Sequence, residues 1–202
     1  MADVYPLKGY RYNSEKEELN NVVTQPYDKI DKELQNDYYQ KSPYNIVRLI
    51  LNKEEGMEKY EKAANYLENW IDEEILVRDD RPVYYAYWQE YDVEGEKRIR
   101  KGFVGLGKIE GEEGVKAHED THEGPKADRL NLIRATEANF GHIFMLYSDK
   151  ERKIISALDK AINASKPLIE VEDNDGNIHK LWPIDDEDTA ELIEAEMKGK
   201  SL

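Results

Sequence analysis

The apolar residues of this chain come in short runs, and segments dense in charge separate these runs. The longest clear run, residues 143–147 (Ile-Phe-Met-Leu-Tyr), has the length of a buried strand and is far too short to span a bilayer. Short runs of this kind suit strands and helices that each bury one side. They predict an α/β protein of the α+β type, in which a mixed or antiparallel sheet with β-hairpins packs against helices. We expect a single such domain over residues 1–202.

Apolar residues at spacings of three and four predict a helix most clearly over residues 58–74, where Trp70 closes the apolar stripe. Pro125 suits the first position of a second helix, over residues 125–138, which would turn Leu130 and Ile133 inward. Three further helices are predicted over residues 31–41, with Asp31 as the N-cap, 151–163 and 186–198.

Two β-hairpins are predicted from turn residues between strand-like segments. The first joins residues 82–91 and 100–109 through a polar turn at Gly95. The second joins residues 168–172 and 177–182 through an Asp-Gly turn. Apolar composition also predicts strands over residues 46–51 and 143–147.

The aromatic residues of the first hairpin have two interpretations. Rings at Tyr84, Tyr85, Tyr87, Trp88 and Tyr91 can stack nucleobases, as in proteins that bind single strands. Strand alternation places them on both faces, so burial on two sides explains them equally well. Basic residues are not interleaved with the rings, and we therefore favour core packing.

The charge, the lack of cysteine and the first residues of the chain each argue against certain classes of protein. Its formal net charge is −15, which argues against a nucleic-acid surface because such surfaces need clustered Lys and Arg. The absence of cysteine excludes disulfides, thiolate metal sites and cysteine nucleophiles. The first residues lack the charged and apolar regions of a secretory signal, so we expect a cytoplasmic protein.

Residues 115–129 are the first candidate site, because they bring histidines, carboxylates, lysines and an arginine together. Such a mixture can move protons and bind a phosphate, and the helix that begins near Pro125 adds free N–H groups for an anion. A solvated polar loop is the alternative.

His118, Glu119 and His122 also match the metalloprotease pattern His-Glu-x-x-His. Gly124 and Pro125 follow too closely for a long helix through both histidines, so we do not expect zinc.

A second candidate is the turn Gln-Pro-Tyr-Asp at residues 25–28, where Tyr27 and Asp28 can line a pocket or belong to an ordinary turn. The Gly-rich signatures of dinucleotide-binding and P-loop folds and the nucleophile elbow of α/β-hydrolases are missing from the sequence.

The order of these segments resembles the amino-terminal half of the "domain of unknown function 1015" family. The resemblance covers essentially the whole chain and rests on the turn 25–28, Trp70, residues 85–90, 102–106, His118-Glu119 with Thr121, Lys126 with Asp128-Arg129, the strand to Tyr147, and residues 179–182. His122 is not part of the family pattern. Family members continue into an Ala-Asp-Gly-His-His-Arg segment that resembles the phosphate-gripping signature of the ParB/sulfiredoxin-like fold. The resemblance therefore implies that this chain is the N-terminal part of a longer protein.

The resemblance also implies a function: part of a nucleotide-dependent phosphotransfer or phosphohydrolase enzyme that acts on a small metabolite such as serine. His118, Glu119 and Asp28 would be catalytic, and the phosphate or substrate would be bound by Lys126, Arg129, Thr121 and Tyr27. We assign no metal ligand; ATP or ADP with Mg²⁺ would be held by the segment that follows. A small-molecule partner is expected, nucleic acid and membrane are not, and a homo-oligomer is left open. The alternative is a non-catalytic interaction or regulatory module.

Overall fold

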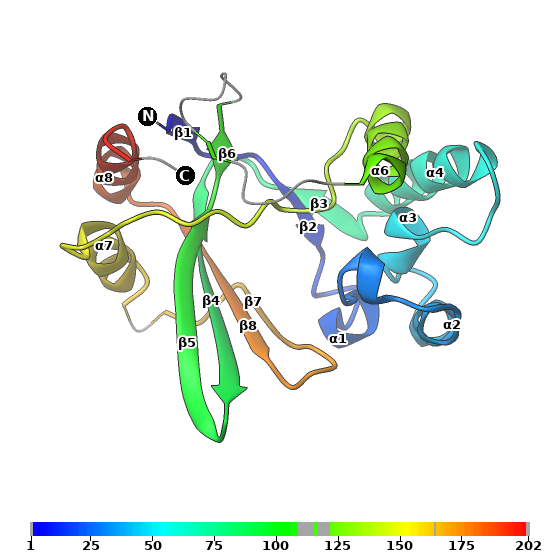
Figure 1. The fold of residues 1–202 in the computed structure, drawn as a ribbon, viewed down its shortest axis with the longest axis horizontal. Coiled ribbons are helices and arrows are strands. Elements are labelled where there is room, and N and C mark those ends of the chain that lie inside the picture. The colour runs from blue at the N-terminus through cyan, green and yellow to red at the C-terminus, as the bar shows by residue number, and fades with distance from the viewer. Residues whose placement is uncertain (1, 109–114, 117–121, 164, 201–202) are drawn as a thin grey trace. The chain divides into compact units, whose positions relative to one another are not determined.

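The computed structural model describes residues 2–108, 115–116, 122–163 and 165–200. The chain divides into two compact units (Figure 1). Unit 1 comprises Met1–Gly9, Asp79–His118 and Phe144–Leu202, and unit 2 comprises Tyr10–Arg78 and Glu119–Ile143. Helices and antiparallel sheets in both units confirm the predicted α+β class. The expectation of a single domain is not tested by this division and stays a prediction.

Unit 1 is built on a four-stranded antiparallel sheet in the order β5-β4-β8-β7, next to a two-stranded pair of β1 with β6. Its elements are β1 (Val4–Tyr5), β4 (Tyr84–Val93), β5 (Glu96–Val104), β6 (Leu106–Gly107), α7 (Lys153–Ala161), β7 (Ile169–Glu172), β8 (Ile178–Ile184) and α8 (Glu187–Met197). Both predicted hairpins are present, as β4–β5 and β7–β8. Glycines with positive φ, Gly95 and Gly176, form their turns, because side chains disfavour that conformation.

Helices α7 and α8 cover one face of the sheet in unit 1. Ile154 and Leu158 from α7 and Ile193 and Met197 from α8 are buried there against Tyr84, Ala86, Trp88, Trp182 and Ile184 of the strands. On β4, Tyr84, Tyr85, Ala86 and Trp88 are all buried, which confirms the prediction that the aromatic strand belongs to the core. Burial of each large aliphatic side chain here, such as Ile154 or Leu158, contributes about 1.5–3 kcal/mol of transfer free energy.

Unit 2 is mostly helical. Its elements are β2 (Tyr10–Tyr12), α1 (Leu19–Val22), the 3₁₀ helix η1 (Tyr27–Lys29), α2 (Lys32–Lys41), α3 (Val47–Ile50), α4 (Glu58–Asp72), β3 (Leu76–Arg78) and α6 (Glu123–Thr136). Strands β2 and β3 pair antiparallel. Asp31 caps α2 as predicted, since its carboxylate accepts a hydrogen bond from the Leu34 N–H at 2.8 Å. The predicted helix over residues 58–74 is α4.

Trp70 on α4 lies at the centre of the core of unit 2. Only 2% of its surface is exposed, and it packs with Leu49, Leu67, Ile75 and Leu76. Three tyrosine rings, those of Tyr12, Tyr44 and Tyr66, surround it at centroid distances of 6.3, 5.9 and 6.0 Å. The amphipathic stripe read from the sequence is therefore the surface by which α4 holds this unit together.

Two predicted strands are wrong. Residues 46–51 contain the short helix α3 instead, where the Asn45 side chain accepts from the Val47 N–H at 3.0 Å and its amide donates to the Asn21 carbonyl at 2.8 Å. Residues 143–147 form no strand, and Ile143, Phe144 and Leu146 are exposed. An apolar run becomes a strand only when a neighbouring strand pairs with its backbone N–H and C=O groups. The described sheets pair other segments.

Helix α6 also differs in detail from the prediction. It begins at Glu123, so Pro125 is its third residue rather than its first. A proline is still tolerated there, since the first N–H groups of a helix have no partner within it. Leu130 and Ile133, expected to face inward, are 46% and 42% exposed, while Leu132 is buried. The prediction that Leu130 and Ile133 face inward is therefore wrong, and Leu132 lies on the buried side of α6.

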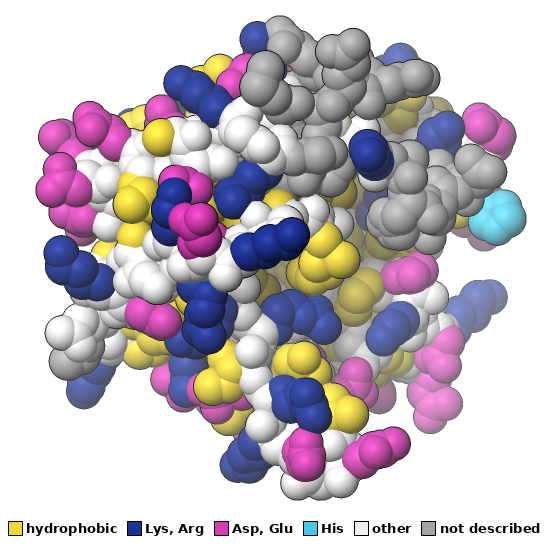
Figure 2. Space-filling model, turned by 60° about the vertical axis from the view of Figure 1, so that its left-hand side comes forward, with side chains coloured by type: hydrophobic (Ala, Val, Ile, Leu, Met, Phe, Trp, Pro, Cys, Tyr) yellow, Lys and Arg dark blue, Asp and Glu magenta, His cyan; other side chains and the backbone are white. Residues whose placement is uncertain are grey.

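The described surface mixes charges of both signs. On the face shown in Figure 2, basic and acidic side chains are interspersed with hydrophobic ones. Among the described residues, no helix is long and apolar enough to cross a membrane.

Candidate functional site

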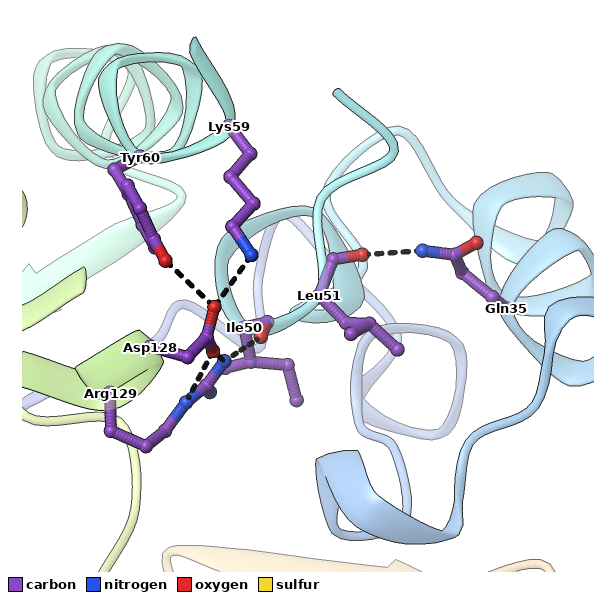
Figure 3. A network of polar contacts seen from close by, with 7 residues as sticks. All are labelled: Gln35, Ile50, Leu51, Lys59, Tyr60, Asp128 and Arg129. Atoms are coloured by element: carbon purple, nitrogen blue, oxygen red, sulfur yellow. Dashed lines mark hydrogen bonds and ion pairs between the residues drawn. The ribbon is translucent and has the colours of Figure 1, made fainter. Parts of the chain in front are cut away.

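Asp128 on α6 is the centre of a polar cluster within unit 2 (Figure 3). Its Oδ1 atom accepts hydrogen bonds from Lys59 Nζ at 2.6 Å and from Tyr60 Oη at 2.8 Å. Lys59 and Tyr60 lie in the first turn of α4, so the carboxylate joins two helices. We refer to Tyr27, Lys59, Tyr60, Asp128 and Arg129 as the Asp128 cluster.

Arg129 is held in one orientation by its neighbours. Its Nε donates to Asp128 Oδ2 at 3.1 Å, and its Nη2 donates to the same oxygen and to the Ile50 carbonyl, the latter at 2.8 Å. The guanidinium lies over the Tyr27 ring, 4.2 Å from its centroid, in a cation–π contact. No hydrogen bond joins Nη1 to a described residue. An arginine fixed in this way loses little side-chain entropy when a ligand binds it.

Hydrogen bonds within the cluster favour the charged forms of both Asp128 and Lys59. Burial works to raise the pKa of Asp128, but hydrogen bonds from Lys59, Arg129 and Tyr60 outweigh it and lower this pKa to about 2. The hydrogen bond to Asp128 raises the pKa of Lys59. Two cations therefore share one carboxylate, and the cluster carries a net positive charge in an acidic chain.

A small hollow lies beside these side chains. Asp128, Arg129, Lys59 and Tyr60 form its polar side, and its apolar side is lined by Leu49, Ile50, Leu51 and Leu132. The side chains of Asp128, Arg129 and Lys59 are 25%, 27% and 33% exposed, so an external molecule can reach them. The arrangement combines fixed donors with an apolar wall in a volume of about 30 Å³, which admits one water-sized group such as a single phosphate oxygen.

The structure brings together two of the residues predicted from the sequence, Tyr27 and Arg129. Asp28 follows Tyr27 in η1 and is exposed. Lys126 lies one turn before Arg129 on α6, where it is 60% exposed and 3.6 Å from the carboxylate of Glu123. His118, Glu119 and Thr121 lie outside the described residues. The roles given to all of these residues stay predictions.

The zinc pattern has no support in the described part of the site. His122 is extended, with φ −68° and ψ 140°, and precedes α6 rather than lying within a helix. The pattern needs its second histidine on a helical turn. Within the described ranges, no group of three or more His, Asp or Glu side chains is arranged to hold a metal ion.

Sequence reasoning missed Lys59 and Tyr60 as site residues. Tyr60 occupies an apolar position at helical spacing in the predicted helix 58–74, as a core residue does, and Lys59 resembles any other charge in a chain of which 36% is charged. Their partner Asp128 is 69 and 68 residues away in the sequence. Only the packing of α4 against α6 shows that these residues meet.

Comparison with known proteins agrees with the family resemblance of the sequence. No curated protein and no solved structure matches the chain. The family described as "Protein of unknown function (DUF1015)" matches over residues 4–202, which is nearly the whole sequence. The chain belongs to the DUF1015 family.

Proposed function

We propose that the Asp128 cluster binds the phosphate or other anionic group of a small metabolite. The chain would then form part of a nucleotide-dependent phosphotransfer or phosphohydrolase enzyme, with serine as one candidate substrate. The observation that carries this proposal is the fixed guanidinium of Arg129, held by Asp128, the Ile50 carbonyl and the Tyr27 ring at the side of a hollow. Preorganised donors bind developing charge without the cost of reorganisation.

Each cation has a distinct part in this proposal. Nη1 of Arg129 would donate to a phosphate or carboxylate oxygen of the ligand, because the planar guanidinium suits such oxygens. Lys59 adds a point charge at the other oxygen of the Asp128 carboxylate, Oδ1. Lys126, three residues before Arg129, lies on a neighbouring part of the helix surface and can extend the positive region.

Proton transfer and binding of the rest of the substrate are assigned to residues predicted from the sequence. We propose that His118 or Glu119 relays a proton and that Asp28 holds the substrate amine or a metal ion. ATP or ADP would supply or accept the phosphoryl group. In-line transfer of this kind depends mainly on positioning and charge, which is what Arg129 and Lys59 would provide.

Calorimetric titration with ADP, ATP, O-phosphoserine and pyrophosphate tests the anion site. Arg129→Ala should weaken binding about 10- to 100-fold, as loss of a charge-assisted hydrogen bond of about 1.5–3 kcal/mol predicts. Arg134→Ala, which removes an exposed arginine from the last turn of the same helix, is the matched control and should have no effect. Arg129→Lys should recover only part of the affinity, because the fork geometry is lost.

One observation favours the alternative, a non-catalytic module. The same contacts join α4 to α6, so the cluster has a purely structural explanation. Equal affinities of Arg129→Ala and Arg134→Ala, or no binding of any of the four probes, would support that alternative and contradict the anion site.

A further inference from the structure

A second polar cluster lies in unit 1, on the sheet. Tyr87 on β4 and His179 on β8 join through Tyr87 Oη and His179 Nδ1 at 2.6 Å, and their rings are nearly parallel, with an interplanar angle of 18°. The other ring nitrogen, Nε2, is 3.0 Å from Oδ2 of Asp173 in the β7–β8 turn. The three side chains thus form a chain of hydroxyl, imidazole and carboxylate.

Asp173 sets the direction of the hydrogen bonds. Its Oδ1 accepts from the Asp175 and Asn177 N–H groups, both at 2.9 Å, and its Oδ2 accepts from the Asn177 amide at 2.9 Å. Burial works to raise its pKa, but these hydrogen bonds and that of His179 outweigh it and lower the pKa. An ionised carboxylate only accepts, so Nε2 of His179 must donate to it. In the neutral ring Nδ1 is then an acceptor, and the Tyr87 hydroxyl donates to it.

This cluster lies on the sheet face opposite to helices α7 and α8. Those helices pack on Tyr84, Ala86 and Trp88, and alternation places Tyr87 on the other side. Across the β4–β5 ladder, Tyr87 faces Gly102, where an added Cβ would meet no atom of a described residue within 4 Å. As far as the described part of the chain goes, the space beside the Tyr87 ring on the β5 side is therefore open.

Arg100 supplies a cation on the same face, one alternate position along β5 from Gly102. Its Nη1 donates to Gln89 Oε1 at 3.3 Å, and its guanidinium makes cation–π contacts with Tyr91 and Phe144, 5.3 and 5.0 Å from the ring centroids. Burial raises the pKa of Tyr87 and the charge of Asp173 adds to that rise, whereas the charge of Arg100 opposes it. A basic acceptor bonded to the hydroxyl and a cation on the same sheet face suit a negatively charged reactant.

We propose that Tyr87, His179 and Asp173 form a base-activated hydroxyl site, separate from the Asp128 cluster, at which Tyr87 attacks the electrophilic centre of a small anionic ester. A bond forms between Tyr87 Oη and the phosphorus or acyl carbon, and the bond to the leaving-group oxygen breaks with its electron pair. The phenol proton moves to His179 Nδ1, and Asp173 stabilises the imidazolium. That proton then passes to the leaving group. Arg100 pairs with the negative charge of the ester.

The test uses two sulfonyl fluorides on the full chain, the anionic 4-(fluorosulfonyl)benzoate and the neutral benzenesulfonyl fluoride. Both label activated phenols, and mass spectrometry measures the rate at each tyrosine. We expect Tyr87 to react about tenfold or more faster than Tyr91, which lies on the same face of β4. His179→Gln and Asp173→Asn should lower the Tyr87 rate about tenfold and leave Tyr91 unchanged. Arg100→Gln should slow only the anionic probe.

The position of the proton on His179 provides a test that needs no substitution. Long-range ¹H–¹⁵N spectra of the unaltered protein at neutral pH should show the proton on Nε2. A proton on Nδ1 would overturn the proposal, as would a Tyr87 rate equal to that of Tyr91. An unchanged Tyr87 rate in a folded His179→Gln or Asp173→Asn variant would also overturn it. Because these residues belong to unit 1, this outcome is independent of the Arg129 experiment.

Discussion

Replacing Asp128 with Asn measures how strongly the Asp128 cluster stabilises unit 2. The pKa of this carboxyl falls from an ordinary 3.8 to about 2 on folding. At about 1.36 kcal/mol for each pH unit, the full difference corresponds to roughly 2.4 kcal/mol. Since 25% of the side chain is exposed, solvent screening reduces this, and we expect a loss of about 1–2 kcal/mol at pH 7.

The pH dependence has a definite sign. The folded pKa is the lower one, so the stabilisation is fully present above pH 3.8 and is lost as the pH falls toward about 2. Asp128→Asn should therefore destabilise the protein at pH 7 and differ little from the unaltered chain near pH 2. The asparagine keeps one acceptor oxygen but lacks the charge that Lys59 and Arg129 require.

Native-state hydrogen exchange is the assay, because it gives opening free energies for each helix separately. The loss should appear in α4 and α6, which Asp128 joins, and be small in α7 and α8 of the other unit. Asp37→Asn, at an exposed position within α2, is the control for loss of a carboxylate. An equal effect of the two substitutions at pH 7, or a loss that does not shrink as the pH falls, would refute the reasoning.

Two further predictions concern stability. Trp70→Ala should cost about 3–5 kcal/mol in urea unfolding, because the ring is buried among three tyrosines and leaves a large cavity; a cost below about 1 kcal/mol would contradict its place at the core. Gly176→Ala should cost about 1 kcal/mol or more, because φ is +79° in the β7–β8 turn. Gly102→Ala should cost less in the same experiment, because Gly102 has no positive φ and no described residue lies close to the added Cβ.

The sequence predicted the parts of the fold that depend on local rules. Gly95 and Gly176 lie where chain reversal needs positive φ, so both hairpins were found. The spacing of apolar residues around Trp70 has a single helical solution, so α4 was found. These signals act within one element and need no knowledge of its neighbours.

The wrong predictions concern segments whose structure depends on distant partners. Residues 46–51 have the composition of a strand, but the buried Asn45 side chain bonds to Asn21 and to the start of α3 and so favours a helical turn. Residues 143–147 have the same composition, and the described strands pair elsewhere. A short apolar run is compatible with strand, helix or irregular chain, and tertiary contacts decide among them.

The site shows the same limit. Tyr27 and Arg129 were chosen for their residue types, and the structure places them in contact. Lys59 gave no signal, since it meets Asp128 only across 69 residues of sequence. A charged residue in a strongly charged chain becomes informative only when its partner is known, and so Lys59, one of the two cations bound to the Asp128 carboxylate, was missed.

The Asp128 cluster can serve structure and ligand binding at once, and two substitutions separate these roles. Arg129→Ala removes the fork but leaves Asp128 bonded to Lys59 and Tyr60, so α4 and α6 stay joined. Asp128→Asn weakens that junction but leaves both cations, and it raises the net positive charge at the hollow. If the cluster binds anions, the first variant loses affinity with little loss of stability, and the second loses stability while still attracting anions. If the cluster is only structural, Asp128→Asn lowers stability in the same way and neither variant changes anion binding.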